Sequence, residues 1–246
     1  MDDDYFDPAA AYGFTFWDLK LARCVRETAK MTIENITELR CFRAGIRDLR
    51  GIEQLPNLMV LDLHLNEVED GGPLARLRHL KELHLGLNQC SALDFLAGMD
   101  SLENLTLFDN EIEDITPLRG LTRLSVLHLR FNAIDDVSAL RNLTEVRELS
   151  LSSNLIDDLS PLAAMTRMEM LNVYRNSIRD ISPLANMKQL REIYLGENPV
   201  ADISVLYEMP NLVTARIENT QVPLAHREYL EGHLARNRAR LGLPPE

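Results

Sequence analysis

Residues 102–123 read LENLTLFDNEIEDITPLRGLTR, and this segment is one copy of a 22-residue pattern that recurs along the chain. Its apolar residues occupy positions one, four, six, eleven, fourteen, seventeen and twenty. Residues 168–189, MEMLNVYRNSIRDISPLANMKQ, carry an apolar residue at each of the same positions. The other copies begin, in the same register, at Ile36, Leu58, Leu80, Leu124, Val146, Leu190 and Leu212. Self-similarity at this fixed period predicts a repeat protein, here with eight full repeats and a truncated ninth.

The first half of each repeat has the pattern of a β-strand, and the second half has that of a short helical turn. Positions three to seven alternate polar and apolar residues, which is the period of a strand with one buried face. Position nine is Asn in seven copies, whose amides should form a buried ladder that satisfies backbone groups: Asn66, Asn88, Asn110, Asn132, Asn154, Asn176 and Asn198. Ser or Thr before Pro, as at Thr116 and Ser160, can cap a turn with its hydroxyl, so we expect a turn or a short 3₁₀ helix.

A single repeat buries too few side chains to be stable alone, so the repeats must stack and both ends of the stack need covers. The N-terminal cover is predicted to be a helix from about Phe16 to Met31, and the C-terminal cover a helix over Leu224–Leu241. The predicted organisation is therefore an N-terminal segment with a capping helix at 1–35, a repeat array at 36–222, and a capping helix and tail at 223–246.

The composition excludes several classes of function. Asp+Glu 38 against Lys+Arg 26 gives a formal net charge of −12, which disfavours nucleic acid because phosphate recognition needs clustered cations. A protein partner with a basic surface is the better electrostatic match. No segment approaches the roughly 18 apolar residues that span a bilayer, and the acidic start at residues 1–4, MDDD, is unlike a secretory signal. We therefore expect no membrane association and a cytoplasmic location.

The sequence offers no group for redox or cofactor chemistry. Cys24, Cys41 and Cys90 lack the spacing of metal ligands, and an odd number of cysteines cannot form a closed set of disulfides. Two of them occupy apolar positions of the repeat, where a free thiol acts as a small hydrophobic side chain. No Gly-rich phosphate loop, nucleophile elbow or HExxH motif occurs. We expect inert thiols and no cofactor.

The pattern LxxLxLxxNxIxDIxPLxxL resembles the 22-residue class of leucine-rich repeats, found in bacterial internalins and in a eukaryotic regulatory subunit of protein phosphatase 1. The resemblance covers residues 36–222, and the segment GIRDLRGIEQLPNL at 45–58 is similar to the internalin cap and first repeat. It implies an α/β solenoid: a right-handed curved array with a parallel β-sheet on its concave side, short 3₁₀ or helical turns on its convex side, and helical caps at both ends. It also implies a binding rather than a catalytic role.

Strand side chains that point outward would line one continuous face of such an array. These are positions three, five, seven and eight, where the fold does not require an apolar residue. Aromatic residues and Arg dominate the energetics of interfaces, and they are frequent at these positions. The repeat with Ser150 and Ser152 is bland, so two patches could flank it. The predicted contact residues are Phe42, His64, His84, Phe108, Asp109, His128, Arg130, Phe131, Tyr174, Arg175, Tyr194 and Glu197.

The histidines leave an alternative open, in which His64, His84 and Asp62 serve a hydrolase with or without a metal. His84 and His128 share a column but lie two repeats apart, about 10 Å at the usual strand spacing, which is too far for one ion. His64 and Asp62 lie beside His84, but no fourth ligand is evident. A metal site is therefore not predicted.

Two charged features have both a structural and a functional interpretation. Asp recurs at position thirteen, as at Asp114 and Asp158, where it either accepts backbone amides before the turn or forms an acidic edge for a basic partner. The C-terminal arginines, including Arg227 and Arg238, fit the solvated face of a capping helix better than a nucleic-acid arm.

The function predicted from the sequence is a protein-binding module, monomeric by itself, that recognises a protein partner through the concave face. A scaffold, an inhibitor, an immunity-type neutraliser or an effector would each fit. The alternatives are the His/Asp hydrolase and the recognition subunit of a larger complex. No enzyme activity is expected.

Overall fold

The computed structural model describes residues 15–28 and 35–244 of the chain. It divides into two compact units, Met1–Arg123 and Leu124–Glu246, and each is described by itself. The acidic start at residues 1–4, the end of the predicted N-terminal helix at residues 29–31, and residues 32–34 lie outside the described residues. Within those residues, no helix is both long enough and apolar enough to cross a bilayer.

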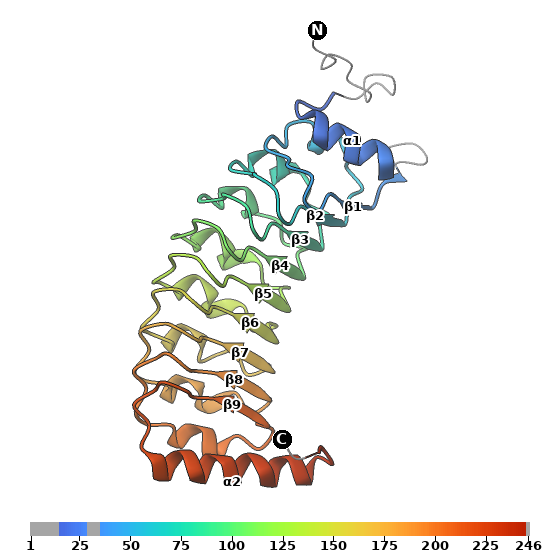
Figure 1. Cartoon of the computed structure of the whole chain (residues 1–246). Helices are drawn as coiled ribbons and strands as arrows, with labels where there is room; N and C mark the ends of the chain where they lie inside the picture. The colour runs from blue at the N-terminus through green and yellow to red at the C-terminus, as the bar shows by residue number, and fades with distance from the viewer. Residues whose placement is uncertain (1–14, 29–34, 245–246) are drawn as a thin grey trace. The chain divides into compact units, whose positions relative to one another are not determined.

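Each unit is a stack of short parallel strands, one from each repeat (Figure 1). The first unit contains β1 (Glu38–Arg40), β2 (Val60–Asp62), β3 (Glu82–His84) and β4 (Asn104–Thr106). The second contains β5 (Val126–His128), β6 (Glu148–Ser150), β7 (Met170–Asn172), β8 (Glu192–Tyr194) and β9 (Thr214–Arg216). Residues 22 positions apart pair across neighbouring strands, as Leu61 does with Leu83 and Leu171 with Ile193. The repeat period of the sequence is therefore the register of the ladder.

The apolar positions of the repeat form the core of each unit. In the repeat that begins at Leu102, the side chains of Leu105, Leu107 and Ile112 are completely buried. Burial of each such side chain stabilises the folded chain by about 2 kcal/mol relative to an exposed one. Because each repeat contributes the same positions, its core is continuous with that of the neighbouring repeats of its unit.

The asparagines of position nine form the predicted amide ladder. In the first unit, the Asn88 amide donates to the carbonyl oxygens of Leu63 at 2.9 Å and Leu85 at 3.0 Å. Its side-chain oxygen accepts the backbone N–H of Val68 at 3.0 Å. Asn198 makes the corresponding three bonds in the second unit. One side chain thus connects two successive repeats, and the prediction is confirmed.

Short 3₁₀ turns complete the repeats, and their capping differs from the prediction. The turn at Thr116–Gly120 is typical, but no hydroxyl caps it. Instead the carboxylate of Asp114 at position thirteen accepts the backbone N–H of Thr116 at 2.7 Å. Hydrogen bonds from the Thr116 hydroxyl and then its backbone lower the pKa of Asp114. The turn interpretation of the Asp column is confirmed, whereas the predicted capping role of Ser and Thr is wrong because the carboxylate is the stronger acceptor.

The N-terminal cap is the helix α1 (Leu19–Thr28), which lies beside β1 (Figure 1). Asp18 caps it: one carboxylate oxygen accepts the backbone N–H of Lys20 at 2.7 Å, and the other accepts that of Arg47 in the first repeat at 2.8 Å. The same side chain therefore starts the helix and attaches it to the stack. Leu21 and Val25 are buried, on a helix that contacts β1 of the first repeat.

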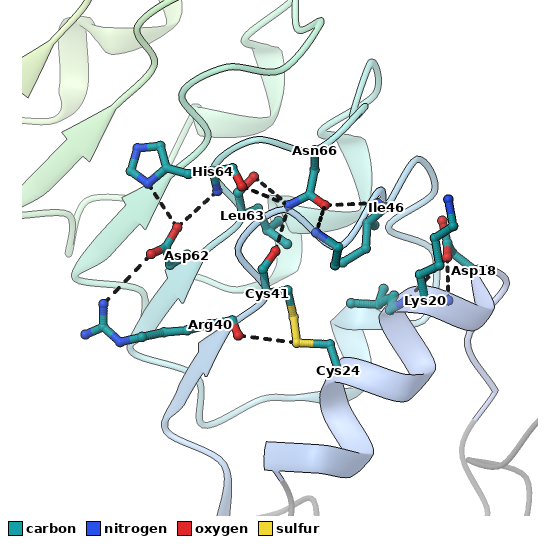
Figure 2. The surroundings of a disulfide bond; sticks show 12 residues. Asp18, Lys20, Cys24, Arg40, Cys41, Ile46, Asp62, Leu63, His64 and Asn66 are labelled. Carbon is teal, nitrogen blue, oxygen red and sulfur yellow. Dashed lines mark hydrogen bonds and ion pairs between the residues drawn. A yellow bond between two sulfur atoms is a disulfide. The ribbon is translucent and has the colours of Figure 1, made fainter.

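A disulfide joins Cys24 of α1 to Cys41, directly after β1, with the Cα atoms 5.8 Å apart (Figure 2). The expectation of inert thiols is wrong for these two residues. An odd number of cysteines still allows one pair when the fold brings two of them together and leaves the third buried. That third residue is Cys90, whose burial raises the pKa of its thiol to about 12. Cys90 therefore agrees with the expectation of an inert thiol.

The C-terminal cap is the helix α2 (Leu224–Arg240). The buried amide of Asn237 donates to the carbonyl oxygens of Met209 at 3.2 Å and Leu212 at 2.9 Å. Arg238 donates to the carbonyl of Val213 at 2.8 Å, and Arg227 to that of Val222 at 2.9 Å. These arginines were expected on a solvated face, but they donate to carbonyl groups of the last repeat, to which no further strand donates backbone N–H groups within the described residues.

Candidate interaction surface on the strands

The residues that alternate with the buried leucines of β1–β4 point to the outside of the first unit. We call this surface the first strand face, and it comprises Arg40, Phe42, Asp62, His64, Glu82, His84, Thr106 and Phe108. Leu39, Leu61, Leu83 and Leu105, which lie between them, are completely buried. The alternation follows from the strand geometry, in which successive side chains point to opposite sides.

Three rings of the first strand face pack together around a glycine. The His64 ring stacks on the His84 ring with the centroids 5.3 Å apart, and it lies at the same centroid distance from the Phe108 ring. A Cβ atom on Gly86 would lie 2.6 Å from Phe108 Cε1 and 2.8 Å from His64 Cδ2. The rings can therefore meet only because position seven of that repeat has no side chain. The sequence did not single out Gly86, because position seven also carries small residues in other repeats, Ser152 and Gly196.

The polar atoms of this cluster form a chain of hydrogen bonds. Asp62 Oδ1 accepts from His64 Nδ1 at 3.0 Å. His64 Nε2 lies 3.3 Å from Thr106 Oγ1, and the same oxygen lies 2.7 Å from His84 Nδ1. His84 Nε2 faces Glu82 Oε2 at 3.7 Å. One hydroxyl thus connects two imidazoles, with a carboxylate at each end of the chain.

The electrostatics of the cluster follow from its partial burial. Desolvation and then the neighbouring His64 lower the pKa of His84, while Asp62 and Glu82 act in the opposite direction. Thr106 is only 6% exposed, so its hydroxyl belongs to the floor of the surface rather than to its rim. At the edge of the face, Arg40 pairs with Glu38 and lies 3.9 Å from Asp62 Oδ2.

The second unit has a strand face of its own on β5–β9, and it is organised differently. His128 Nε2 bonds to Glu148 Oε1 at 2.7 Å, and the Arg130 guanidinium lies 5.6 Å from the centre of the Phe131 ring. On β8, the hydroxyl of Tyr194 donates to Glu192 at 2.8 Å. This second strand face comprises those residues together with Ser150, Ser152, Tyr174, Arg175 and Glu197.

Position eight of every repeat has a left-handed backbone. The φ angles at these positions lie between 51° and 58°, in Arg43, Leu65, Leu87, Asp109, Phe131, Ser153, Arg175, Glu197 and Asn219. A non-glycine residue in this region is strained, and Asn or Asp tolerates it best. The predicted contact residues Asp109, Phe131, Arg175 and Glu197 therefore extend from the turn after each strand rather than from the strand itself.

The predicted contact residues divide by unit and by exposure. Of those in the first unit, the structure brings together His64, His84 and Phe108, while Phe42 stands out at 60% exposed. In the second unit, Arg130 and Phe131 form a pair in which Phe131 is 47% exposed. Ser150 and Ser152 are buried, so the repeat expected to be bland contributes little surface. Asp62, Glu82 and Thr106 complete the cluster and were not among the predicted contacts.

The cluster contains groups that can exchange protons, but they are not placed to hold a metal ion. Among residues 15–28 and 35–244, no group of three or more His, Cys, Asp or Glu side chains is placed to hold a metal ion. Asp62, His64 and Thr106 stand in the order carboxylate, imidazole and hydroxyl. The hydroxyl, however, is shared with a second imidazole and is nearly buried.

Comparison with known proteins identifies the family. The family model "Leucine Rich repeats (2 copies)" matches residues 100–142, 122–164, 144–186 and 166–208. The crystal structure of internalin C2 from Listeria monocytogenes is 36% identical, and the match covers 82% of this chain and 94% of that one with a TM-score of 0.80. An internalin of the same species, InlF, is 31% identical over 84% of this chain and 71% of its own, with a TM-score of 0.69. An uncharacterized protein of Caenorhabditis elegans is 37% identical over 76 residues, which span 31% of this chain but only 16% of that protein.

The fold and the repeats therefore define a leucine-rich-repeat protein, and the predicted solenoid class is confirmed. Within that family, the chain belongs to the internalin-like leucine-rich-repeat proteins. Proteins of this family are typically non-enzymatic and bind other proteins.

Proposed function

We propose that this protein is a non-enzymatic binding module that recognises a protein partner through its strand faces. The observation that carries the proposal is the cluster of His64, His84 and Phe108 on the first strand face. The buried leucines already meet the requirements of the repeat, so these rings are not needed for the core. Aromatic groups held rigidly on an exposed face are the usual anchors of an interface.

The partner is a protein with a basic surface. The chain has a formal net charge of −12, and Asp62 and Glu82 belong to the first strand face. Complementary charge raises the rate of encounter and selects among partners more than it raises affinity. Nucleic acid is the opposite case, because it requires a basic surface on the protein. The binding module acts as a monomer.

The contacts that we propose are exposed or half-buried residues of the two strand faces, together with Asp109 in the turn beside the first. They are Phe42, His64, His84, Phe108 and Asp109 in the first unit and His128, Arg130, Phe131, Tyr174, Arg175, Tyr194 and Glu197 in the second. A scaffold, an inhibitor, an immunity-type protein, an effector and the recognition subunit of a larger complex all use such faces. The division into 1–35, 36–222 and 223–246 is kept as the proposed domain organisation.

The experiment compares partner capture by full-length variants. Phe42→Ala with Phe108→Ala removes two anchors of the first strand face, and Phe131→Ala with Tyr174→Ala removes two of the second. The matched control replaces Leu155 and Tyr229, which are 61% and 54% exposed but lie off the strand faces. A protein that the wild type captures from a lysate of the native cell should be captured in an amount at least about tenfold lower by a strand-face variant. The control should retain capture, and retention by both strand-face variants would overturn the proposal.

A hydrolase remains the second candidate, and it has one supporting observation. Asp62, His64 and Thr106 stand in the order of a carboxylate–imidazole–hydroxyl relay, with contacts of 3.0 Å and 3.3 Å. Activity toward simple esters that disappears in His64→Gln would favour it over the binding module. The metal-dependent form of this candidate has no supporting cluster within the described residues.

The proposed location is the cytoplasm, but the Cys24–Cys41 disulfide of the structure argues against it, so the state of this bond in the cell is the test. Disulfides persist in oxidising compartments and are rare in the cytosol. Thiol alkylation of Cys24 and Cys41, in protein isolated from its native cell, distinguishes the cytosol from an oxidising compartment. Two free thiols support the cytoplasm, whereas an intact disulfide contradicts it.

A further inference from the structure

We propose that His64, Thr106 and His84 act as one coupled proton-binding unit, in which a proton on one ring opposes a proton on the other. The coupling is a property of the free protein. Its consequence for a partner rests on the function proposed above. One proton changes the charge of the first strand face without any change in the fold.

The shared hydroxyl is the geometric basis of the coupling. Thr106 Oγ1 lies 2.7 Å from His84 Nδ1 and 3.3 Å from His64 Nε2, and a hydroxyl has only one proton to donate. His64 Nδ1 donates to Asp62 at 3.0 Å, so neutral His64 has its lone pair on Nε2, toward Thr106. Thr106 then donates to His64 and accepts from His84. The protonation state of one ring therefore determines the direction of the hydrogen bond at the other.

The charged groups around the pair favour the first proton. Asp62 on β2 faces His64, and Glu82 on β3 faces His84 at 3.7 Å. From β1, Arg40 approaches Asp62 at 3.9 Å but is itself paired with Glu38. Thr106 of β4 and Phe108, two residues after it, contribute a neutral hydroxyl and a neutral ring to the cluster. Two carboxylates thus flank two imidazoles, and a single cation between them is stabilised.

The second proton would place two cationic rings in a stack. The ring centroids are 5.3 Å apart, and both side chains are partly withdrawn from water, so their repulsion is poorly screened. Burial and then His64 lower the pKa of His84, which agrees with this repulsion. With both rings protonated, Thr106 would also face two N–H donors and could no longer donate to either ring.

The charge change bears directly on the proposed partner. At neutral pH the carboxylates of Asp62 and Glu82 attract a basic surface. The first proton adds one positive charge between them as the pH falls. Affinity for a basic partner should therefore decrease on mild acidification, with the histidines acting as the sensor.

The test follows the titration of each histidine by NMR in the full-length protein between pH 4 and 8. We expect the curves of His64 and His84 to be coupled, each showing two steps. His64→Gln should convert the His84 curve to one step and raise its midpoint by about one pH unit. Thr106→Val should change both curves, whereas Thr106→Ser, which keeps the hydroxyl, should leave them close to those of the wild type.

His128 is a matched control within the same chain. It occupies the same column as His84 and bonds to one carboxylate, Glu148, at 2.7 Å. Its curve should show one step and should not respond to substitution of His64. Independent single-step curves for His64 and His84, unchanged when the other ring is replaced, would overturn the coupling. Because no partner is used, that outcome is separate from failure of the proposed function, which would appear as capture that strand-face substitutions do not affect.

Discussion

Cys24 and Cys41 form a disulfide that joins the capping helix α1 to the end of β1, across a sequence separation of 17 residues. The bond closes a loop that includes the segment between the cap and the first strand. Cys24 Sγ also lies 3.4 Å from the carbonyl oxygen of Arg40, which places the bond against the strand itself (Figure 2).

Replacing both cysteines by serine should lower the free energy of unfolding by about 3 kcal/mol, the amount typical of a loop of this length. The reason is that the unfolded chain regains the freedom that the bond removes. Urea unfolding of the oxidised protein and of the double variant measures the difference. Wild type unfolded in a reducing agent, which breaks the bond without any substitution, is the control, and an equal midpoint for oxidised wild type and double variant would contradict the prediction.

Gly86→Ala should destabilise the protein by about 1–3 kcal/mol, because its Cβ would overlap the rings of His64 and Phe108. Gly120→Ala is the control, since the nearest atom to its Cβ would be Asp100 Oδ1 at 3.9 Å. That substitution should leave stability unchanged or raise it slightly by restricting the unfolded chain. Thermal unfolding of the two variants gives the comparison, and equal effects would show that the rings do not depend on Gly86.

Asn88→Ala should cost about 3 kcal/mol, because it leaves the carbonyl groups of Leu63 and Leu85 and the N–H of Val68 without their side-chain partner. Asn186→Ala, at the exposed end of a 3₁₀ turn, is the control and should change stability little. Chemical denaturation measures both. A cost for Asn88 no larger than that for Asn186 would show that the ladder does not stabilise the stack.

The left-handed position eight should respond to side-chain shape rather than to hydrophobicity. Leu65 has φ 56°, so Leu65→Val should cost about 1–2 kcal/mol because branching at Cβ increases the strain. Leu65→Asn should be neutral or stabilising despite the loss of an apolar side chain. Denaturant midpoints of the two variants test this. A Val variant more stable than the Asn variant would mean that burial, and not backbone strain, determines which side chain is favoured at position eight.

Asp158 should make stability fall at acid pH. Hydrogen bonds from the Ser160 hydroxyl and backbone lower the pKa of Asp158 from 3.8. A carboxylate with a lowered pKa in the folded state contributes stability above about pH 4, and that contribution is lost as the pH falls below 3.8 through the folded-state pKa. The stability difference between wild type and Asp158→Asn should therefore shrink between pH 5 and pH 2. Asp157→Asn removes the same charge from the preceding residue, and an identical pH profile for both variants would rule out the turn as the cause.

The period of the sequence was sufficient to predict the strands, the asparagine ladder and the turns. A residue repeated every 22 positions reports a local environment that is also repeated, so the pattern averages over many copies. The period could not predict features that occur only once in the chain. The pairing of Cys24 with Cys41 and the contacts of Arg238 with the last repeat occur only at the ends, where no second copy exists to reveal them.

The candidate surface likewise has features that the sequence predicted and features that it could not predict. The sequence alone determined which columns point outward, because alternation along a strand is a property of the backbone. Only the tertiary structure decided which members of those columns meet. Thr106 lies 42 residues from His64, and Gly86 lies between the repeats that carry His64 and Phe108. Stacking brings these residues within hydrogen-bond or van der Waals distance, and such contacts depend on side-chain size and direction in three neighbouring repeats at once.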